Sequence, residues 1–305
     1  MKVSVVSPVY RSKALVPELV ARIRAVMIPL GVDWELILVD DACPEGSWDV
    51  IVAEAKADHH VRGFKLSRNF GQHYAITAGL DRVSGDAVVV MDCDLQDRPE
   101  EIPRLLEEMR KGYDVVLARR VDRKDGFFKK LFSRLFYRTL GYLTGSEQDE
   151  TVGNFGIYSA AVITEVRRLR ESIRYFPTMV KWVGFRTTKL DVEHAGRTVG
   201  KSSYNLNRML RLAMDIILAY SDKPLRMLVK FGVIVAVLSL VLVVYTLVQW
   251  ALGDITVLGY ASLITSIWFL SGCMMITLGV VGLYVGKTFE GVKDRPLYII
   301  ERTTE

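Results

Sequence analysis

The sequence predicts an α/β fold over residues 1–200, a Rossmann-like, mostly parallel sheet with helices on both faces, followed by two membrane-crossing helices. Two observations predict this arrangement. Short apolar runs alternate with segments of helical periodicity before residue 120, which is typical of parallel strands joined by crossover helices. Residues 231–286 then contain one charged residue, Asp254, and uncharged stretches of this length are typical of membrane spans.

The expected strands are short apolar runs that end in polar or turn-forming residues. Each is followed by a segment in which apolar residues recur every three or four positions, as on the buried face of a helix. The predicted strands cover residues 3–7, 35–39, 63–66, 87–91 and 114–118. The predicted helices cover residues 15–27, 47–57 and 74–83, and a further helix that begins near Pro99 carries Ile102, Leu105, Leu106 and Met109 on one face.

Residues 92–97, Asp-Cys-Asp-Leu-Gln-Asp, directly follow the apolar run 87–91 and are the most informative segment. Ligands of open α/β sheets bind beyond the carboxyl ends of the strands, where this segment falls. Two carboxylates at positions i and i+2 can reach one hard cation, which is commonly shared with substrate phosphates. The segment therefore predicts a metal–diphosphate site. The alternative is an acidic turn in which Asp97 caps the next helix.

The apolar C-terminal part predicts a membrane hairpin with transmembrane helices at residues 227–252 and 257–286. Lys and Arg flank the hairpin before the first span and after the second, whereas the link at residues 253–256 has neither. The positive-inside rule then places residues 1–200 and the tail 287–305 in the cytoplasm. The alternative is a pair of buried helices in a soluble core.

Two amphipathic segments precede the hairpin. Residues 127–143 place apolar side chains on one helical face and Lys or Arg around the rest, which favours a helix lying in the membrane interface over a core helix with a solvated basic face. Residues 201–226 predict a juxtamembrane amphipathic helix. Residues 119–138 hold eight Lys or Arg against two Asp, and an anionic membrane explains this patch better than nucleic acid does, because the chain carries its own hairpin.

Several motifs, taken in order, resemble those of the family 2 glycosyltransferases, which have the GT-A fold. They are residues 5–10 (Val-Val-Ser-Pro-Val-Tyr), 39–41 (Val-Asp-Asp), 68–73 (Arg-Asn-Phe-Gly-Gln-His), 85–86 (Gly-Asp) and 92–102 (Asp-Cys-Asp-Leu-Gln-Asp-Arg-Pro-Glu-Glu-Ile). More narrowly, the chain resembles the bacterial polyprenyl-phosphate glycosyltransferases. This narrower resemblance rests on residues 197–205 (Arg-Thr-Val-Gly-Lys-Ser-Ser-Tyr-Asn), on residues 224–226 (Pro-Leu-Arg) and on the membrane hairpin. It covers nearly the whole chain.

The resemblance implies a nucleotide-sugar site. Pro8 and Tyr10 would line the base and ribose pocket, although plain turn chemistry also explains them. Asp40 or Asp41 would accept hydrogen bonds from the base or the ribose. The residues implied to hold Mg²⁺ or Mn²⁺ and the diphosphate, through oxygen atoms that suit these ions, are Asp92, Asp94 and Gln96. The residues implied to cover the diphosphate from the other side are Arg197, Lys201, Ser202 and Tyr204.

The resemblance also implies an acceptor-phosphate site. A polyprenyl monophosphate is mostly ionised near pH 7, since its second pKa is about 6, so positioning and charge neutralisation would carry most of the rate. Arg119 matches the acceptor-phosphate arginine of the family, and Lys129 and Lys130 are candidates for the same task or else solvated surface charges. An acidic residue near the acceptor matches Asp149 or, equally, Glu150. The implied catalytic set is Asp94, Asp149 and Arg119.

The chain departs from the family pattern after this acidic residue. Some relatives read Asp-x-Thr-Ser-Gly-Phe-Arg, whereas residues 154–156 here are Asn-Phe-Gly, without the arginine. The role of Asp149 or Glu150 as a base or an orienting group is therefore left open.

The resemblance, together with the predicted hairpin, implies an enzyme of the bacterial inner membrane that transfers one hexose, with inversion, from a nucleotide sugar to undecaprenyl phosphate. Glucose from UDP-glucose is the first choice, and GDP-mannose and UDP-linked amino sugars remain open. The rival enzyme, a processive polysaccharide synthase, would need a Gln-x-x-Arg-Trp motif, which the sequence lacks. The rival of another class is a non-catalytic membrane scaffold that binds anionic lipid. Small residues in the second span make a homo-oligomer plausible, namely Gly272, Gly279, Gly282 and Gly286.

Overall fold

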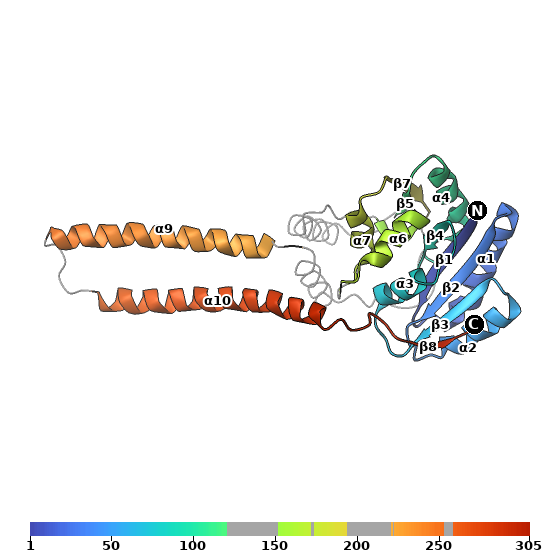
Figure 1. The fold of residues 1–305 in the computed structure, drawn as a ribbon, viewed down its shortest axis with the longest axis horizontal. Helices are drawn as coiled ribbons and strands as arrows, with labels where there is room; N and C mark the ends of the chain where they lie inside the picture. Colours follow the sequence, from blue (N-terminus) through green and yellow to red (C-terminus); the bar gives the residue numbers. More distant parts are fainter. Residues whose placement is uncertain (121–151, 172–173, 194–220, 222, 253–258) are drawn as a thin grey trace. The chain divides into compact units, whose positions relative to one another are not determined.

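The computed structural model describes the chain except residues 121–151, 172–173, 194–220, 222 and 253–258 (Figure 1). The chain divides into two compact units. The first consists of Met1–Tyr137, Asp149–Tyr204 and Arg295–Glu305, and the second consists of Arg138–Gln148 and Asn205–Asp294.

The first unit is an α/β domain built on one sheet. Its described strands are β1 (Lys2–Val9), β2 (Asp33–Asp40), β3 (Val61–Leu66), β4 (Ala87–Val90), β5 (Val115–Arg120), β6 (Val152–Ser159), β7 (Thr187–Val192) and β8 (Ile300–Thr303). Its described helices are η1 (Lys13–Leu15), α1 (Val16–Leu30), α2 (Ser47–Ala57), α3 (Gln72–Leu80), η2 (Pro99–Glu101), α4 (Ile102–Arg110), α6 (Ala160–Arg168) and α7 (Phe176–Val183). The predicted α/β fold with a mostly parallel sheet is therefore confirmed.

The strands lie in the order β7-β5-β6-β4-β1-β2-β3-β8. All pairs are parallel except those that β6 makes with β4 and β5 and the pair of β8 with β3. Because β6 runs against its neighbours, its first residues lie at the same sheet edge as the carboxyl ends of β4 and β5. That edge is where open α/β sheets bind their ligands.

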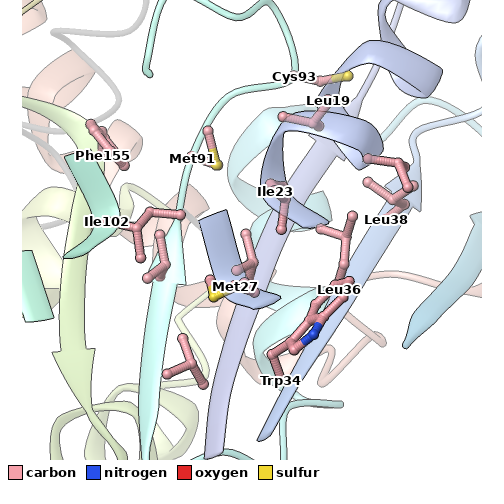
Figure 2. Close-up of a cluster of buried hydrophobic side chains, with 14 of the residues drawn as sticks. Leu19, Ile23, Met27, Trp34, Leu36, Leu38, Met91, Cys93, Ile102 and Phe155 are labelled. Carbon is pink, nitrogen blue, oxygen red and sulfur yellow. The ribbon is translucent and has the colours of Figure 1, made fainter. Parts of the chain in front are cut away.

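Both faces of the sheet are covered, and the alternation of side chains along each strand supplies one core to each face. On β2, Leu36 and Leu38 belong to one cluster of buried side chains, whereas Ile37 and Val39 belong to the other. Figure 2 shows the first cluster, where Leu19, Ile23 and Met27 of α1 lie over Trp34, Leu36 and Leu38 of β2. Helices α3, α6 and α7 contribute to the second cluster. Nearly continuous apolar strands such as β1 and β4 follow from this double burial.

Strand β8 adds a further edge strand next to β3, although the sequence analysis expected only a tail at residues 287–305. Ile300–Thr303 pairs antiparallel with β3, and Thr304 accepts a hydrogen bond from Gly63 N through its Oγ1 at 2.8 Å. Lys65 of β3 forms an ion pair with Glu301 at 3.0 Å. The chain therefore returns to the sheet of the first unit after α10.

The second unit contains two long helices, α9 (Lys223–Ala251) and α10 (Tyr260–Val292). Tyr284 on α10 donates a hydrogen bond to the carbonyl oxygen of Ser221, just before α9, at 2.8 Å. Among the described residues, one helical segment is long and apolar enough to cross a membrane, Phe269–Phe289, with a mean hydropathy of 1.8 and none of its length buried. The two-helix hairpin stays a prediction.

Candidate active site

Three neighbouring strands of the sheet end in predicted site residues. The central order β4-β1-β2 places Asp92 after β4, Tyr10 after β1 and Asp41 after β2 at one edge. Each strand leads into a residue with positive φ that is not glycine, namely Arg11 (φ 55°), Ala42 (φ 50°) and Leu95 (φ 60°). Such conformations cost energy and concentrate at functional sites, so their presence at these three strand ends marks this edge as the candidate site.

Of the two residues predicted to line the nucleotide pocket, Pro8 is buried as the penultimate residue of β1 and Tyr10 is 41% exposed. Of the two, Tyr10 is therefore the residue whose side chain is accessible from solvent.

The two consecutive carboxylates after β2 have different partners. Asp41 accepts hydrogen bonds from Phe70 N at 2.7 Å and from Gly71 N at 2.9 Å, one on each carboxylate oxygen. Asp40 accepts one from Cys43 N at 2.9 Å through Oδ1, while its buried Oδ2 finds no partner among the described residues. Burial raises the pKa of both carboxyl groups above the usual range, against the hydrogen bonds that lower it. Asp41 therefore holds the loop 68–71, and Asp40 retains an oxygen atom that needs a partner.

The acidic segment after β4 forms a tight turn built from its own side chains. Asp94 accepts a hydrogen bond from Gln96 N at 3.2 Å through Oδ1, and Asp97 accepts one from Asp92 N at 3.3 Å. The expected alternative, in which Asp97 caps the next helix, is wrong, because η2 starts after Arg98 and has no side-chain cap. The carboxylate of Asp97 instead closes the turn that carries Asp92 and Asp94.

This turn suits a divalent cation. Asp92, Asp94 and Gln96 are half-buried and supply the hard oxygen donors that Mg²⁺ and Mn²⁺ bind. A tighter group among the described residues is Asp58, His59 and His60, whose ligand atoms lie within 4.8 Å of one another. There the carboxylate of Asp58 is already paired with Arg24 and His60, each at 2.7–2.8 Å, and His60 stacks on Trp34. That group is a surface ion-pair cluster and lies before β3, at the other end of the strands.

Asp92 is contacted by two amide side chains that were not among the predicted site residues. Gln72, the first residue of α3, donates a hydrogen bond from Nε2 to Asp92 Oδ1 at 2.7 Å. Asn154 of β6 donates from Nδ2 to the same oxygen at 3.5 Å. Gln72 lies in the motif at residues 68–73 and Asn154 in the segment 154–156, and the fold brings both to one carboxylate.

His73, which follows Gln72, is a packing residue. Its ring meets that of Tyr175 edge-on at 4.9 Å, and its Nδ1 accepts a hydrogen bond from Phe176 N at 3.5 Å. Burial, with a smaller effect of the charge on Arg174, lowers the pKa of His73 to about 4, so the ring is neutral at physiological pH.

Arg119, the predicted acceptor-phosphate residue, lies near the carboxyl end of β5. Its guanidinium forms a two-point ion pair with Asp191 of β7, with Nη2 to Oδ2 at 3.0 Å. The side chains of both residues are about half exposed. No motif or periodicity in the sequence points to Asp191. The predicted residues Asp149, Glu150, Lys129, Lys130, Arg197, Lys201, Ser202 and Tyr204 lie outside the described residues.

Gly156, in the segment where some relatives of the resembled family have an arginine, lies at a crowded position of β6. A Cβ atom at this position of β6 would lie 2.7 Å from the carbonyl oxygen of Val116 and 3.0 Å from the hydroxyl of Tyr158. The buried Tyr158 donates from that hydroxyl to the carbonyl oxygen of Asn154 at 3.1 Å. A side chain at position 156 would therefore displace either the sheet backbone or the Tyr158 contact that supports Asn154.

Comparison with known proteins agrees with this geometry. The solved structure of glucosyl-3-phosphoglycerate synthase from Mycobacterium tuberculosis, in complex with phosphoglyceric acid, superposes with a TM-score of 0.54 at 18% identity, over 72% of this chain and 80% of that one. A second structure of that enzyme, with Mn²⁺, UDP and phosphoglyceric acid, gives a TM-score of 0.53 at 16% identity, over 72% and 76% of the two chains. At these identities the likeness shows a shared GT-A-like fold.

Sequence relatives are closer. An uncharacterized glycosyltransferase of Bacillus subtilis (strain 168), YkcC, is 36% identical over 301 residues, which cover 98% of this chain and 93% of the relative. The undecaprenyl-phosphate 4-deoxy-4-formamido-L-arabinose transferase of Salmonella paratyphi A is 36% identical over 313 residues, which cover 99% of this chain and 93% of the relative. The model of the family Glycosyl transferase family 2 matches residues 4–166. This chain therefore belongs to glycosyltransferase family 2 and is a glycosyltransferase.

Proposed function

We propose that this glycosyltransferase moves one sugar from a nucleotide sugar to a polyprenyl phosphate, with inversion at the anomeric carbon. The observation that carries the proposal is the turn at the end of β4, where Asp92 and Asp94 stand beside the strand ends that bear Tyr10 and Asp40. The polyprenyl acceptor is supported by the Salmonella transferase, which is named for undecaprenyl phosphate and matches this chain over nearly its whole length.

For the donor, we assign the metal and the diphosphate to Asp92, Asp94 and Gln96. A bound Mg²⁺ or Mn²⁺ supplies Lewis-acid neutralisation of the charge that develops on the leaving nucleoside diphosphate. We assign recognition of the nucleobase to Asp40 and not to Asp41. Both oxygens of Asp41 already accept backbone hydrogen bonds, whereas Oδ2 of Asp40 lacks a partner among the described residues. Tyr10 would cover the ribose. The M. tuberculosis structure with Mn²⁺ and UDP supports a divalent ion in this fold.

For the acceptor, we propose that Arg119 binds the phosphate of the polyprenyl phosphate. A phosphate monoester near pH 7 carries the negative oxygen that attacks the anomeric carbon, so no strong base is required of Asp149 or Glu150. Two anions must approach each other, and a guanidinium at the end of β5 lowers the cost of that approach. Lys129 and Lys130 remain proposed contacts of the acceptor phosphate, and Arg197, Lys201, Ser202 and Tyr204 remain proposed contacts of the donor diphosphate, because the family resemblance implies these roles.

The sugar is proposed from two sources. The sequence resemblance favours glucose from UDP-glucose, whereas the Salmonella relative is named for 4-deoxy-4-formamido-L-arabinose. A donor panel that contains both decides between them.

We also propose that α9 and α10 cross the membrane as a hairpin with the catalytic unit in the cytoplasm. Strand β8 lies in the same sheet as β3, so the chain between them returns to its starting side and crosses the membrane an even number of times. Since α10 contains one apolar span, α9 is its partner. Large apolar side chains on α9, including Val233, Ile234 and Leu238, are more than half exposed, as lipid-facing residues are. A cysteine introduced between α9 and α10 should react with a membrane-impermeant thiol reagent added to intact cells. Labelling of that cysteine only after the cells are opened would exclude the hairpin.

The experiment that tests the reaction is transfer of radiolabelled sugar into an organic-extractable lipid. Purified full-length protein receives undecaprenyl phosphate and Mg²⁺ or Mn²⁺, with UDP-glucose, UDP-galactose, UDP-N-acetylglucosamine, GDP-mannose and the nucleotide-linked formamido-arabinose supplied separately. Label in the lipid with one donor, lost in Asp94→Ala, establishes the reaction and the sugar. No lipid label with any donor, despite nucleotide binding, would reject the acceptor or the sugars tried. Loss of nucleotide binding as well would favour the membrane scaffold.

A further inference from the structure

One carboxylate oxygen of Asp92 receives two neutral amide donors. Gln72 Nε2 lies 2.7 Å from Asp92 Oδ1, and Asn154 Nδ2 lies 3.5 Å from the same atom. The two amides come from α3 and β6, which flank the turn from different parts of the chain. Of the two, the Gln72 contact has the distance of a strong hydrogen bond.

The position of Gln72 is set by the loop before it. Gly71 has φ 106°, a conformation that favours glycine, and its N–H and that of Phe70 are both held by the carboxylate of Asp41. The carbonyl oxygen of Gly71 then accepts hydrogen bonds from Tyr74 N and Ala75 N, which closes the first turn of α3. The backbone of Gln72 is therefore fixed from both sides.

The side chain of Gln72 is not needed for the core. The buried residues of α3 begin at Ala75, and Gln72 itself is exposed. Its amide nevertheless reaches across to Asp92, so the contact joins the turn after β4 to the loop held by the carboxylate after β2. A neutral donor can orient a carboxylate without the competing positive charge that a Lys or Arg would bring to a cation site.

We propose that Gln72 is the positioning residue for the metal–diphosphate site, and that Asn154 assists it. The amide of Gln72 holds the Asp92 carboxylate in one orientation and connects the Asp40–Asp41 turn to the metal-binding turn through Gly71. This inference rests on the proposed function, because it takes Asp92 as a metal ligand. Hydrogen-bond partners of ligating carboxylates typically affect metal affinity by 10–100-fold, and an exposed partner belongs near the lower figure.

The test is a titration of purified full-length protein with Mn²⁺ in the presence of UDP or GDP, whichever the wild type binds. The electron paramagnetic resonance signal of free Mn²⁺ measures the binding. Gln72→Met keeps the length of the side chain and removes the donor. Gln72→Asn keeps the amide but shortens its reach. Both are expected to weaken Mn²⁺ binding on the order of tenfold. Asn154→Ala, which removes the longer contact, should weaken it less.

Three further measurements separate positioning from a general structural effect. The melting temperature and the nucleotide affinity without metal should stay at wild-type values in both Gln72 variants, as they should in Glu107→Ala, an exposed residue of α4. In sugar transfer, the Mn²⁺ concentration that gives half-maximal rate should rise while kcat at saturating Mn²⁺ changes little.

Wild-type Mn²⁺ affinity in Gln72→Met would overturn the positioning role and leave the proposed function intact. Equal losses of Mn²⁺ affinity and of melting temperature would also overturn it, in favour of a structural role. If the wild type itself bound no Mn²⁺ with either nucleotide, the proposed metal site would fail first and the positioning role with it.

Discussion

Arg119 and Asp191 are direct partners in the parallel register of β5 and β7, and their side chains form a two-point ion pair. The guanidinium proposed to receive the acceptor phosphate is therefore already partly neutralised by a carboxylate. A phosphate dianion can satisfy the same two N–H groups, because both anions present two oxygens in the geometry that a guanidinium matches.

Replacing Asp191 by Asn should lower the KM for the polyprenyl phosphate. The amide removes one negative charge from the approach of the acceptor and leaves Arg119 in place. The expected change is a few-fold at low salt, since charges on half-exposed side chains interact weakly and are screened. Initial rates at varied acceptor and fixed donor measure it. Arg119→Ala is the counterpart and should raise the same KM. A higher acceptor KM in Asp191→Asn would show that the carboxylate orients Arg119 instead of competing with the acceptor.

Asp40 and Asp41 should differ in their effects on stability and on nucleotide binding when each is changed to an amide. Asp41→Asn replaces an acceptor of two backbone N–H groups, at 2.7 and 2.9 Å, and should cost about 2 kcal/mol of folding free energy, as loss of a hydrogen bond to a charged group does. Asp40→Asn should change stability less and weaken nucleotide binding more. Thermal unfolding with and without UDP or GDP measures both effects. Equal nucleotide affinities in Asp40→Asn and the wild type would show that Asp40 does not bind the nucleobase.

Glu35 should give the fold a defined acid sensitivity. Burial alone would raise its pKa, but hydrogen bonds from Ser4, Ser84 and Arg62 outweigh burial and lower the pKa to about 2 from the usual 4.5. A carboxyl group with a lowered pKa in the folded state stabilises the fold fully above pH 4.5, and this contribution is lost as the pH falls towards 2. The shift corresponds to about 3 kcal/mol. Chemical unfolding at a series of pH values measures the slope, which should be shallower over this window in Glu35→Gln. An unchanged slope in that variant would assign the acid sensitivity to other groups.

The residue that follows β8, Thr304, should contribute to stability through its side chain. Thr304→Val removes the acceptor of the Gly63 N–H bond but keeps the shape, and should cost about 1–2 kcal/mol because a partly buried backbone donor loses its partner. Thr303→Val is the matched control. That threonine is exposed and its hydroxyl accepts a hydrogen bond from the nearby Glu305 N, so its effect should stay within about 0.5 kcal/mol. Denaturant unfolding of the two variants compares them. A loss in Thr304→Val no larger than that in the control would mean that Gly63 N finds another acceptor.

The sequence predicts those parts of the fold that depend on local pattern. The strands β1 to β5 follow from apolar runs, and the turn at Asp92 follows from its position after one of them. Strand β8 has no such signal, because Ile300–Thr303 is short and mostly polar. Its backbone pairing with β3 and the ion pair between Lys65 and Glu301 hold it in the sheet. The reversed direction of β6 is likewise set by its neighbours, since an apolar run reads the same in either direction.

In the site, sequence supplies the residue types but not their partners. Asp40 and Asp41 are equivalent in sequence, and only the loop at Phe70 and Gly71 distinguishes them. The pairing of Arg119 with Asp191 joins residues 72 positions apart and depends on strand order. Contacts of this kind are tertiary, and no periodicity or motif records them.

The place of β8 in the chain has a consequence for biogenesis. The ribosome makes this strand after α9 and α10, so the edge of β3 stays unpaired while the two helices are being synthesised. An unpaired edge strand is a site for unwanted association with other chains. In the proposed topology, insertion of the hairpin and completion of the sheet are thus successive steps in one order, and a chain whose second helix failed to return to the cytoplasm would leave its sheet open.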